Sequence, residues 1–323
     1  MPKKIAFIFP GQGAQTVGMG KDLYDNYDAA KEIFTTSDKV LNKNITKLCF
    51  EGPDEELKQT INTQPAIVTM SIAALECLKS ELEIQPDFTA GHSLGEYCAM
   101  YAANVMDLKT TLLAIQKRAE LMSEVKGGSM AAILNAPDGT LEDAIKEASS
   151  TGYVDVANYN SPQQTVITGD DDAVKSAGEI LLAKGARRVV PLAVSGAFHS
   201  KYMENAGKEF ESFVSSLDLN NASIPVITNV DAEGTTLAED FRAKMPRQIY
   251  SSVYWTQTIQ KMVENGVEIF NSYLSQIRQL YLPLDPTAEY GRPFEPDFNI
   301  RYFNITKWVT DKEENSLEKL VNV

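Results

Sequence analysis

Phe88-Thr89-Ala90-Gly91-His92-Ser93-Leu94-Gly95-Glu96-Tyr97 is the stretch of sequence that decides the fold. Its centre has the G-x-S-x-G form, with an apolar run at 88–90 that predicts a strand and a run at 96–103 that predicts a helix. A serine on such a tight turn holds its hydroxyl clear of the backbone, and the helix N-terminus behind it favours a developing negative charge. The alternative is an ordinary helix-entry serine in a Gly-rich turn.

Strands and helices alternate outward from this turn. Residues 5–9 predict another short strand, and the longer stretches 21–41 and 65–82 predict helices, the second with Pro65 in its first turn. Further along, 201–217 and 253–263 predict helices around a strand at 226–229. This alternation predicts an α/β fold with a parallel sheet, here a larger, hydrolase-like catalytic domain formed by residues 1–126 and 195–270.

The pattern changes between residues 127 and 194. Strands are expected at 130–134, 154–158, 164–168 and 188–192, and helices at 141–148 and 172–183. The order βαββαβ predicts a smaller ferredoxin-like domain inserted into the larger one, with glycines at 127, 128 and 196 as hinges. A cleft between two such domains is a usual place for a small-molecule site. Residues 271–323 form an atypical Pro-rich C-terminal segment, in which only 315–321 predicts a helix.

Composition limits the possible functions. The chain has 323 residues, 43% of them apolar, and no apolar run long enough to cross a membrane, so we expect a cytoplasmic protein. A monomer is expected as well. The net charge of −14 argues against nucleic acid as a partner. Cys49, Cys77 and Cys98 lack metal-ligand spacing, and we expect reduced thiols and no metal site.

A nucleophilic serine needs a base, and the chain has two histidines, His92 and His199. His92 is adjacent to Ser93, where neighbouring side chains diverge, so a structural role is expected for it. His199 lies in the small-residue turn Gly196-Ala197-Phe198-His199-Ser200 at the predicted domain boundary. A lone histidine is commonly a surface or core residue, but if Ser93 is a nucleophile then His199 is its expected base by elimination.

Two further elements are candidates for the site. A dinucleotide-binding loop after the first strand is discounted because position 16 is Thr16, and a Gly-flanked turn there can instead present a backbone N–H. Gln12 N–H and Leu94 N–H would then form a two-donor oxyanion hole. Arg118 lies on a predicted amphipathic helix, where it is either a solvated arginine or a bidentate clamp for a substrate carboxylate.

These features together give the chain a family resemblance. From about residue 5 to 270 it resembles the malonyl-CoA:acyl carrier protein transacylases of fatty-acid synthesis, and more distantly the acyltransferase domains of polyketide synthases. Several matching segments in the family's order are more specific than any one of them. They are Phe9-Pro10-Gly11-Gln12-Gly13, Thr63-Gln64-Pro65-Ala66, Gly91-His92-Ser93-Leu94-Gly95-Glu96-Tyr97, Lys117-Arg118, Asn158-Tyr159-Asn160-Ser161-Pro162, Gly196-Ala197-Phe198-His199-Ser200 and Arg247-Gln248.

The resemblance implies an [acyl-carrier-protein] S-malonyltransferase with malonyl-CoA and acyl carrier protein as substrates and no cofactor. It implies Ser93 as nucleophile, His199 as base and Arg118 as the ligand of the malonyl carboxylate. The N–H groups of Gln12 and Leu94 would form the oxyanion hole, and the backbone carbonyl of Gln248 would orient the histidine in place of an aspartate.

One departure from the family leaves other functions open. Members normally follow the strand at 267–270 with a Gly-Pro-Gly turn and a final helix, whereas this chain has Asn271-Ser272-Tyr273-Leu274. The alternatives are a serine thioesterase or hydrolase, and a catalytically impaired module that binds acyl carrier protein. The chain has no histidine after His199, which argues against the hydrolase. A basic cluster, Lys184-Gly185-Ala186-Arg187-Arg188, is either a helix C-cap or a dock for an acidic carrier protein.

Overall fold

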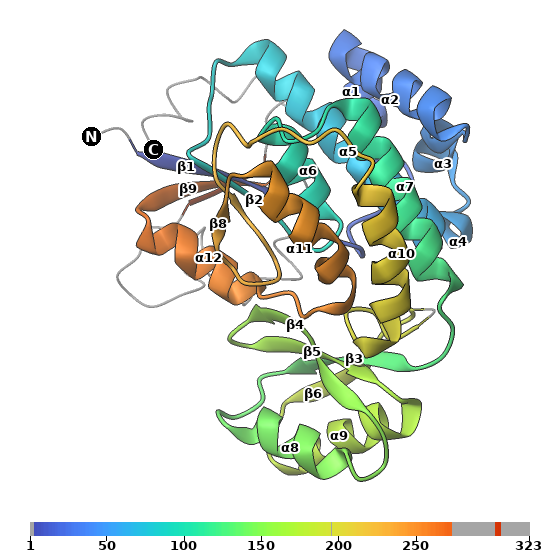
Figure 1. Ribbon diagram of the computed structural model, residues 1–323, viewed down its shortest axis with the longest axis vertical. Coiled ribbons are helices and arrows are strands. Elements are labelled where there is room, and N and C mark those ends of the chain that lie inside the picture. Colours follow the sequence, from blue (N-terminus) through green and yellow to red (C-terminus); the bar gives the residue numbers. More distant parts are fainter. Residues whose placement is uncertain (1–2, 195, 273–300, 305–323) are drawn as a thin grey trace.

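The computed structural model describes residues 3–194, 196–272 and 301–304 (Figure 1). They form two sheets, one of six strands in the order β10-β9-β1-β2-β7-β8 and one of four strands in the order β4-β5-β3-β6. The strands of the larger sheet are β1 (Lys4–Phe9), β2 (Phe88–Gly91), β7 (Val226–Ile227), β8 (Gly234–Thr235), β9 (Val267–Ser272) and β10 (Arg301–Asn304). Those of the smaller sheet are β3 (Ser129–Leu134), β4 (Val154–Ser161), β5 (Gln164–Gly169) and β6 (Arg188–Pro191).

The larger sheet is parallel except at one edge. β1 pairs in parallel with β2 and β9, β2 with β7, and β9 with β10, whereas β7 and β8 are antiparallel. Both faces are covered, because Phe7 and Phe9 of β1 belong to one apolar core while Ala6 and Ile8 belong to another. A parallel sheet buried on both faces is the expected product of strands alternating with helices, so the predicted α/β fold class is confirmed.

The helices are divided between the two sheets. α5, α6 and α7 lie on one side of the larger sheet together with α10 and α11, and α12 lies near β9 and β7 (Figure 1). Their bounds are α1 (Lys21–Asn26), α2 (Asp28–Leu41), α3 (Ile45–Glu51), α4 (Asp54–Leu57), α5 (Thr60–Glu81), α6 (Gly95–Ala102), α7 (Leu108–Glu124), α10 (Glu204–Val214), α11 (Ala238–Tyr250) and α12 (Trp255–Glu264). A 3₁₀ turn, Lys201–Met203, precedes α10.

The smaller sheet is antiparallel, with α8 (Thr140–Ala148) and α9 (Asp171–Ala183) on its outer face (Figure 1). Ala131 and Ile133 of β3 pack in the core under these helices. The alternate residues Met130 and Ala132 belong to the main core instead. The element order from β3 to β6 is βαββαβ, and the inner face of this sheet lies against the larger part of the protein.

Some predicted elements were wrong in their bounds. The stretch 21–41 is two helices, because Tyr27 between them is extended and its side chain is buried in the core. Pro65 is not in the first turn of its helix but inside α5, which begins at Thr60. This helix persists across a missing N–H because residues on all its sides, from Thr63 to Leu78, are largely buried.

Other elements were not predicted at all. The sequence patterns did not predict α3, α4, α11 or β8. The strand expected at 226–229 ends at Ile227. The edge strand β10 comes from the Pro-rich segment, where no strand was expected. The helix predicted at 315–321 lies outside the described residues, as do Ser195 and the Tyr273-Leu274 part of the departure from the family pattern.

Candidate active site

Ser93 lies on the turn between β2 and α6 with a left-handed backbone, φ 51°. The two glycines of the motif make this turn possible. A Cβ on Gly91 would lie 1.9 Å from the carbonyl carbon of Gly95, and a Cβ on Gly95 would lie 2.6 Å from the carbonyl oxygens of Phe9 and Pro10. The chain is therefore too close to itself for any side chain at either position, and the spacing that predicted the turn has a steric cause.

Asn229 fastens the same turn from outside the motif. Its Oδ1 accepts the Ser93 N–H at 2.7 Å, and its Nδ2 donates to the Gly91 carbonyl at 2.8 Å. Its own N–H donates to Glu96 Oε2 at 2.6 Å. The Asn229 amide thus supplies hydrogen-bond partners for backbone groups at the left-handed turn, where neither the strand nor the helix provides them. Sequence analysis missed this residue, because an asparagine after a short strand also suits an ordinary turn.

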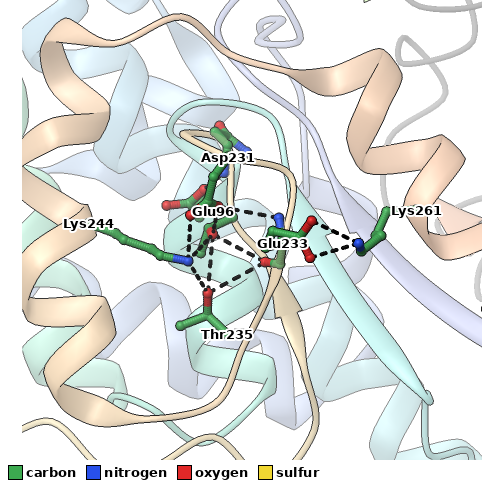
Figure 2. A network of polar contacts seen from close by, with 8 residues as sticks. Glu96, Asp231, Glu233, Thr235, Lys244 and Lys261 are labelled. Atoms are coloured by element: carbon green, nitrogen blue, oxygen red, sulfur yellow. Dashed lines mark hydrogen bonds and ion pairs between the residues drawn. The ribbon is translucent and has the colours of Figure 1, made fainter.

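Glu96 is buried beside a wider polar network. In that network Lys244 bonds to Asp231 and Thr235, and Lys261 bonds to Glu233 (Figure 2). Burial raises the pKa of Glu96 to about 7, against the opposing effects of the Asn229 N–H and of the positive charge of Arg118. Glu96 Oε2 accepts the Asn229 N–H three residues beyond the serine.

Asn229→Ala is expected to slow acylation of Ser93 by about tenfold or more and to lower the unfolding temperature. It removes the side-chain partner of the buried Gly91 carbonyl and of the partly buried Ser93 N–H, and an unsatisfied buried group costs about 1–3 kcal/mol. Acyl-enzyme formation followed by intact mass, with a thermal melt, measures both effects. Asn265→Ala serves as control, since this exposed side chain bonds to the Lys261 carbonyl of its own helix and to no other described residue. Unchanged acylation in Asn229→Ala would leave the amide without a role in the turn.

His199 is far from Ser93 in the sequence but contacts it in the structure. Its Nε2 lies 2.8 Å from Ser93 Oγ, and its Nδ1 lies 3.0 Å from the Gln248 carbonyl oxygen and 3.1 Å from that of Ser251. Carbonyl oxygens only accept, so Nδ1 carries the proton and Nε2 is left to accept the Ser93 hydroxyl proton. Burial, followed by the positive charge of Arg118, lowers the pKa of His199 to about 3, so the imidazole is neutral at physiological pH.

Arg118 is buried, 1% exposed, so the interpretation as a solvated helix-face arginine is wrong. It projects from α7, and its Nη2 donates to Ser93 Oγ at 2.9 Å. Its other contacts within the described residues are with neutral groups: the Gln64 and Gln248 side chains and the Tyr97 ring, whose centroid is 5.7 Å away. No carboxylate of the described residues lies within ion-pair distance of it. Burial lowers the pKa of this guanidinium, which stays cationic.

The loop that carries Gln12 packs against the serine turn. A Cβ on Gly11 would lie 2.6 Å from His92 Nδ1, so only glycine allows this approach. Across the described residues, neither the Gln12 N–H nor the Leu94 N–H donates a hydrogen bond to a protein acceptor. The Gln12 side chain points elsewhere and donates to Thr60 Oγ1 at 3.3 Å. One of these two donors follows Ser93 directly in the chain and the other lies in the loop that approaches His92, which fits the predicted oxyanion hole.

His92 faces away from the serine. Its Nε2 lies 2.8 Å from Asn160 Oδ1, and its ring meets Trp255 edge-on with a centroid separation of 5.5 Å. Burial lowers the pKa of His92 to about 4, so it too is neutral. The structure brings together Ser93, His199 and Arg118 and leaves His92 in a packing position.

The class of protein is an acyl transferase, because the acyl transferase domain family matches residues 6–272. A malonyl CoA-acyl carrier protein transacylase of Bacillus subtilis (strain 168) is 43% identical over 271 residues, which are 83% of this chain and 85% of that protein. One of Staphylococcus aureus (strain MW2) is 39% identical over the same length, covering 83% of this chain and 87% of its own. The chain belongs to the family of malonyl CoA-acyl carrier protein transacylases.

Solved structures agree with the family. An acyl carrier protein S-malonyltransferase from Vibrio cholerae has a TM-score of 0.84 at 36% identity, covering 88% of this chain and 95% of that one. A malonyl-transacylase solved in complex with a type II polyketide synthase acyl-carrier protein has a TM-score of 0.83 at 34% identity, covering 86% and 92%. Among the described residues, no helix combines the length and the apolar character needed to span a membrane.

Proposed function

We propose that this protein transfers a malonyl group from malonyl-CoA, through an ester on Ser93, to the phosphopantetheine thiol of acyl carrier protein. The observation that carries the proposal is the position of Ser93 Oγ, 2.8 Å from a neutral imidazole nitrogen and 2.9 Å from a buried guanidinium. The first contact activates a nucleophile. The second puts a cation that forms no ion pair with any described residue at the place where a substrate with a distal carboxylate reacts. The names of the relatives support the same reaction.

In the first half-reaction, His199 Nε2 takes the proton of Ser93 as Oγ attacks the thioester carbonyl carbon. The N–H groups of Gln12 and Leu94 hold the oxyanion of the tetrahedral intermediate. The intermediate collapses by breaking the carbon–sulfur bond, and the imidazolium returns its proton to the departing coenzyme A sulfur. The second half-reaction runs the same steps in reverse order, with the carrier-protein thiol giving its proton to His199 and attacking the ester.

The environment of His199 suits this role. Two backbone carbonyls, those of Gln248 and Ser251, fix the tautomer without adding a negative charge to a site whose substrate is an anion. A carboxylate there would instead offset the charge of Arg118, which we propose as the ligand of the malonyl carboxylate. Ser93, His199 and the substrates supply every proton and bond of the sequence, so we propose no cofactor.

Intact mass spectrometry tests the proposal directly. Mixing with malonyl-CoA should add the mass of one malonyl group to the protein, and phosphopantetheinylated carrier protein should then remove it and gain it. Release of the group into water at the same rate without carrier protein would indicate the hydrolase. Absence of any adduct would indicate the impaired carrier-binding module.

We propose the division of the chain into a larger domain of residues 1–126 and 195–270 and a smaller one of residues 127–194. The separate core under α8 and α9 supports it, as do the left-handed backbones of Gly127 and Gly128 at the junction, φ 90° and 75°. The cytoplasmic location, the monomeric state and the absence of a nucleic acid partner stay predictions.

We also propose that the basic cluster 184–188 steers carrier protein. Arg187 and Arg188 are exposed and form no ion pair with another described residue, whereas Lys184 lies 3.7 Å from Asp143. Arg188 opens β6 at the end away from the hinge, opposite Leu134. Exposed cations of this kind act mainly on the association rate and are screened by salt over about 8 Å.

Reversing both arginines, Arg187→Glu with Arg188→Glu, is expected to raise the apparent KM for carrier protein several-fold and to flatten its salt dependence. Acylation by malonyl-CoA should change much less. Steady-state kinetics at two ionic strengths measure the first effect, and the rate of adduct formation measures the second. Equal impairment of both half-reactions would contradict a carrier-specific dock, and no change in either would mean that these arginines have no part in carrier binding.

A further inference from the structure

The guanidinium of Arg118 is held by the carboxamide groups of two glutamines. Glutamates of nearly the same shape would fit in the same places. Its Nη1 donates to Gln64 Oε1 at 2.6 Å, and its Nε and Nη2 donate to Gln248 Oε1 at 3.2 and 3.0 Å. Both glutamines are buried, 1% exposed. The neighbouring acid with an electrostatic effect on Arg118 is Glu96, which has its own partner in the Asn229 N–H.

The orientation of each carboxamide is fixed by its other end. Gln248 Nε2 donates to the Ser93 carbonyl at 2.8 Å, and Gln64 Nε2 lies 3.6 Å from Met122 Sδ. These contacts turn both oxygens towards Arg118. Glutamine and glutamate have nearly the same shape, so a glutamate at position 64 could accept the same Nη1 hydrogen bond. The difference that glutamine makes here is one of charge.

That difference decides what the guanidinium can bind. A buried cation paired with an internal carboxylate has its charge neutralised, and a second anion then gains little from approaching it. A cation held by neutral acceptors is fixed in position but keeps its charge. The Nη2 hydrogen now shared with Ser93 Oγ, together with the remaining Nη1 hydrogen, is then available to a ligand that brings its own negative charge.

We propose that Gln64 and Gln248 determine acyl selectivity, by positioning Arg118 with neutral acceptors so that the carboxylate of the substrate is its counter-ion. The inference rests on the proposed function, since it assigns the substrate carboxylate to Arg118. It predicts that a charge change alone at position 64, with no change of shape, moves the enzyme from malonyl towards neutral acyl groups.

The test compares Gln64→Glu, Gln64→Met and the wild type with malonyl-CoA and acetyl-CoA, using the rate of acyl-enzyme formation at Ser93 by intact mass. In Gln64→Glu we expect the malonyl-to-acetyl ratio to fall by about tenfold or more. In Gln64→Met the ratio should stay within about threefold of the wild type, because the cation keeps its charge although it loses one acceptor. Gln59→Glu places the same new charge on the exposed residue that precedes α5 and should leave both rates unchanged.

The outcomes separate this inference from the proposed function. A wild type without any malonyl adduct refutes the function itself. A wild type that forms the adduct, with an unchanged ratio in Gln64→Glu, overturns only the role of the carboxamides. The same holds if Gln64→Glu and Gln64→Met lose selectivity equally, since the hydrogen bond and not the charge would then matter. If Gln64→Glu fails to fold, the same ratio in Gln248→Glu decides, because that side chain meets the guanidinium from its other edge.

Discussion

Ser93→Ala is expected to form no acyl-enzyme at all while keeping its fold, because the hydroxyl contributes the nucleophile and little to packing. In established serine–histidine units, loss of the serine costs about 10⁶-fold in kcat. Within the described part of the chain, the Oγ atom bonds only to His199 Nε2 and Arg118 Nη2, so its removal leaves a neutral imidazole and a guanidinium that retains its glutamine partners. Intact mass after mixing with malonyl-CoA measures the adduct, and a thermal melt measures the fold.

His199→Ala should lose nearly as much as Ser93→Ala, and the double variant should lose hardly more than either, since the two residues act as one unit. Ser123→Ala is the matched control, because this half-buried serine of α7 bonds through its hydroxyl to the Glu120 carbonyl and to no other residue that the structure describes. Near-normal transfer by either single variant would remove Ser93 and His199 from the proposed mechanism. Additive losses would mean that the two act in separate steps.

The serine turn could be predicted from sequence because its constraints are local. Gly91 and Gly95 are required by contacts within four residues or with the adjacent strand end, and a motif records such contacts at fixed spacing. His199 was accessible for a different reason: a chain with two histidines leaves few candidates for a base. The α/β fold class followed in the same way from alternating periodicities.

Arg118 shows where local pattern stops being informative. Its helix is amphipathic. When several helices pack around such a helix, residue spacing alone does not tell whether a given side chain is exposed or buried. α7 is enclosed by α2, α5 and α10, so a position that suits solvent in isolation is 1% exposed in the fold. The family motif, and not the periodicity, supplied the expectation of a clamp.

The tertiary supports of the site could not be predicted. Asn229 and Glu96 are far apart in the sequence, and their joint hold on Ser93 depends on β7 lying beside β2 in the larger sheet. The break at Tyr27 and the position of Pro65 inside α5 have the same origin, since burial of the surrounding residues overrides local propensity. Such features come from the assembled core and leave no signal at a fixed spacing.

Arg118→Ala is expected to slow transfer of malonyl far more than transfer of acetyl. Only the malonyl group has a distal carboxylate, and this carboxylate would lose the guanidinium that we propose as its partner. Removing one side of a buried, charge-assisted pair costs about 2–5 kcal/mol, so the malonyl-to-acetyl ratio of acylation rates should fall by about tenfold or more. Acetyl-CoA is the internal control, since both substrates use the same Ser93 and the same proposed oxyanion donors.

Arg118→Lys tests which property of the guanidinium matters. An ammonium keeps the charge, but it cannot reach Gln64, Gln248 and Ser93 in one plane as the guanidinium does. We therefore expect Arg118→Lys to recover part of the malonyl preference with a slower malonyl rate than the wild type. If Arg118→Ala lowers the acylation rates with malonyl-CoA and acetyl-CoA equally, Arg118 has a structural role. Its contact with Ser93 Oγ affects the nucleophile in the same way for every acyl group. A selective loss that lysine partly reverses would identify the positive charge beside Ser93 as the source of malonyl preference.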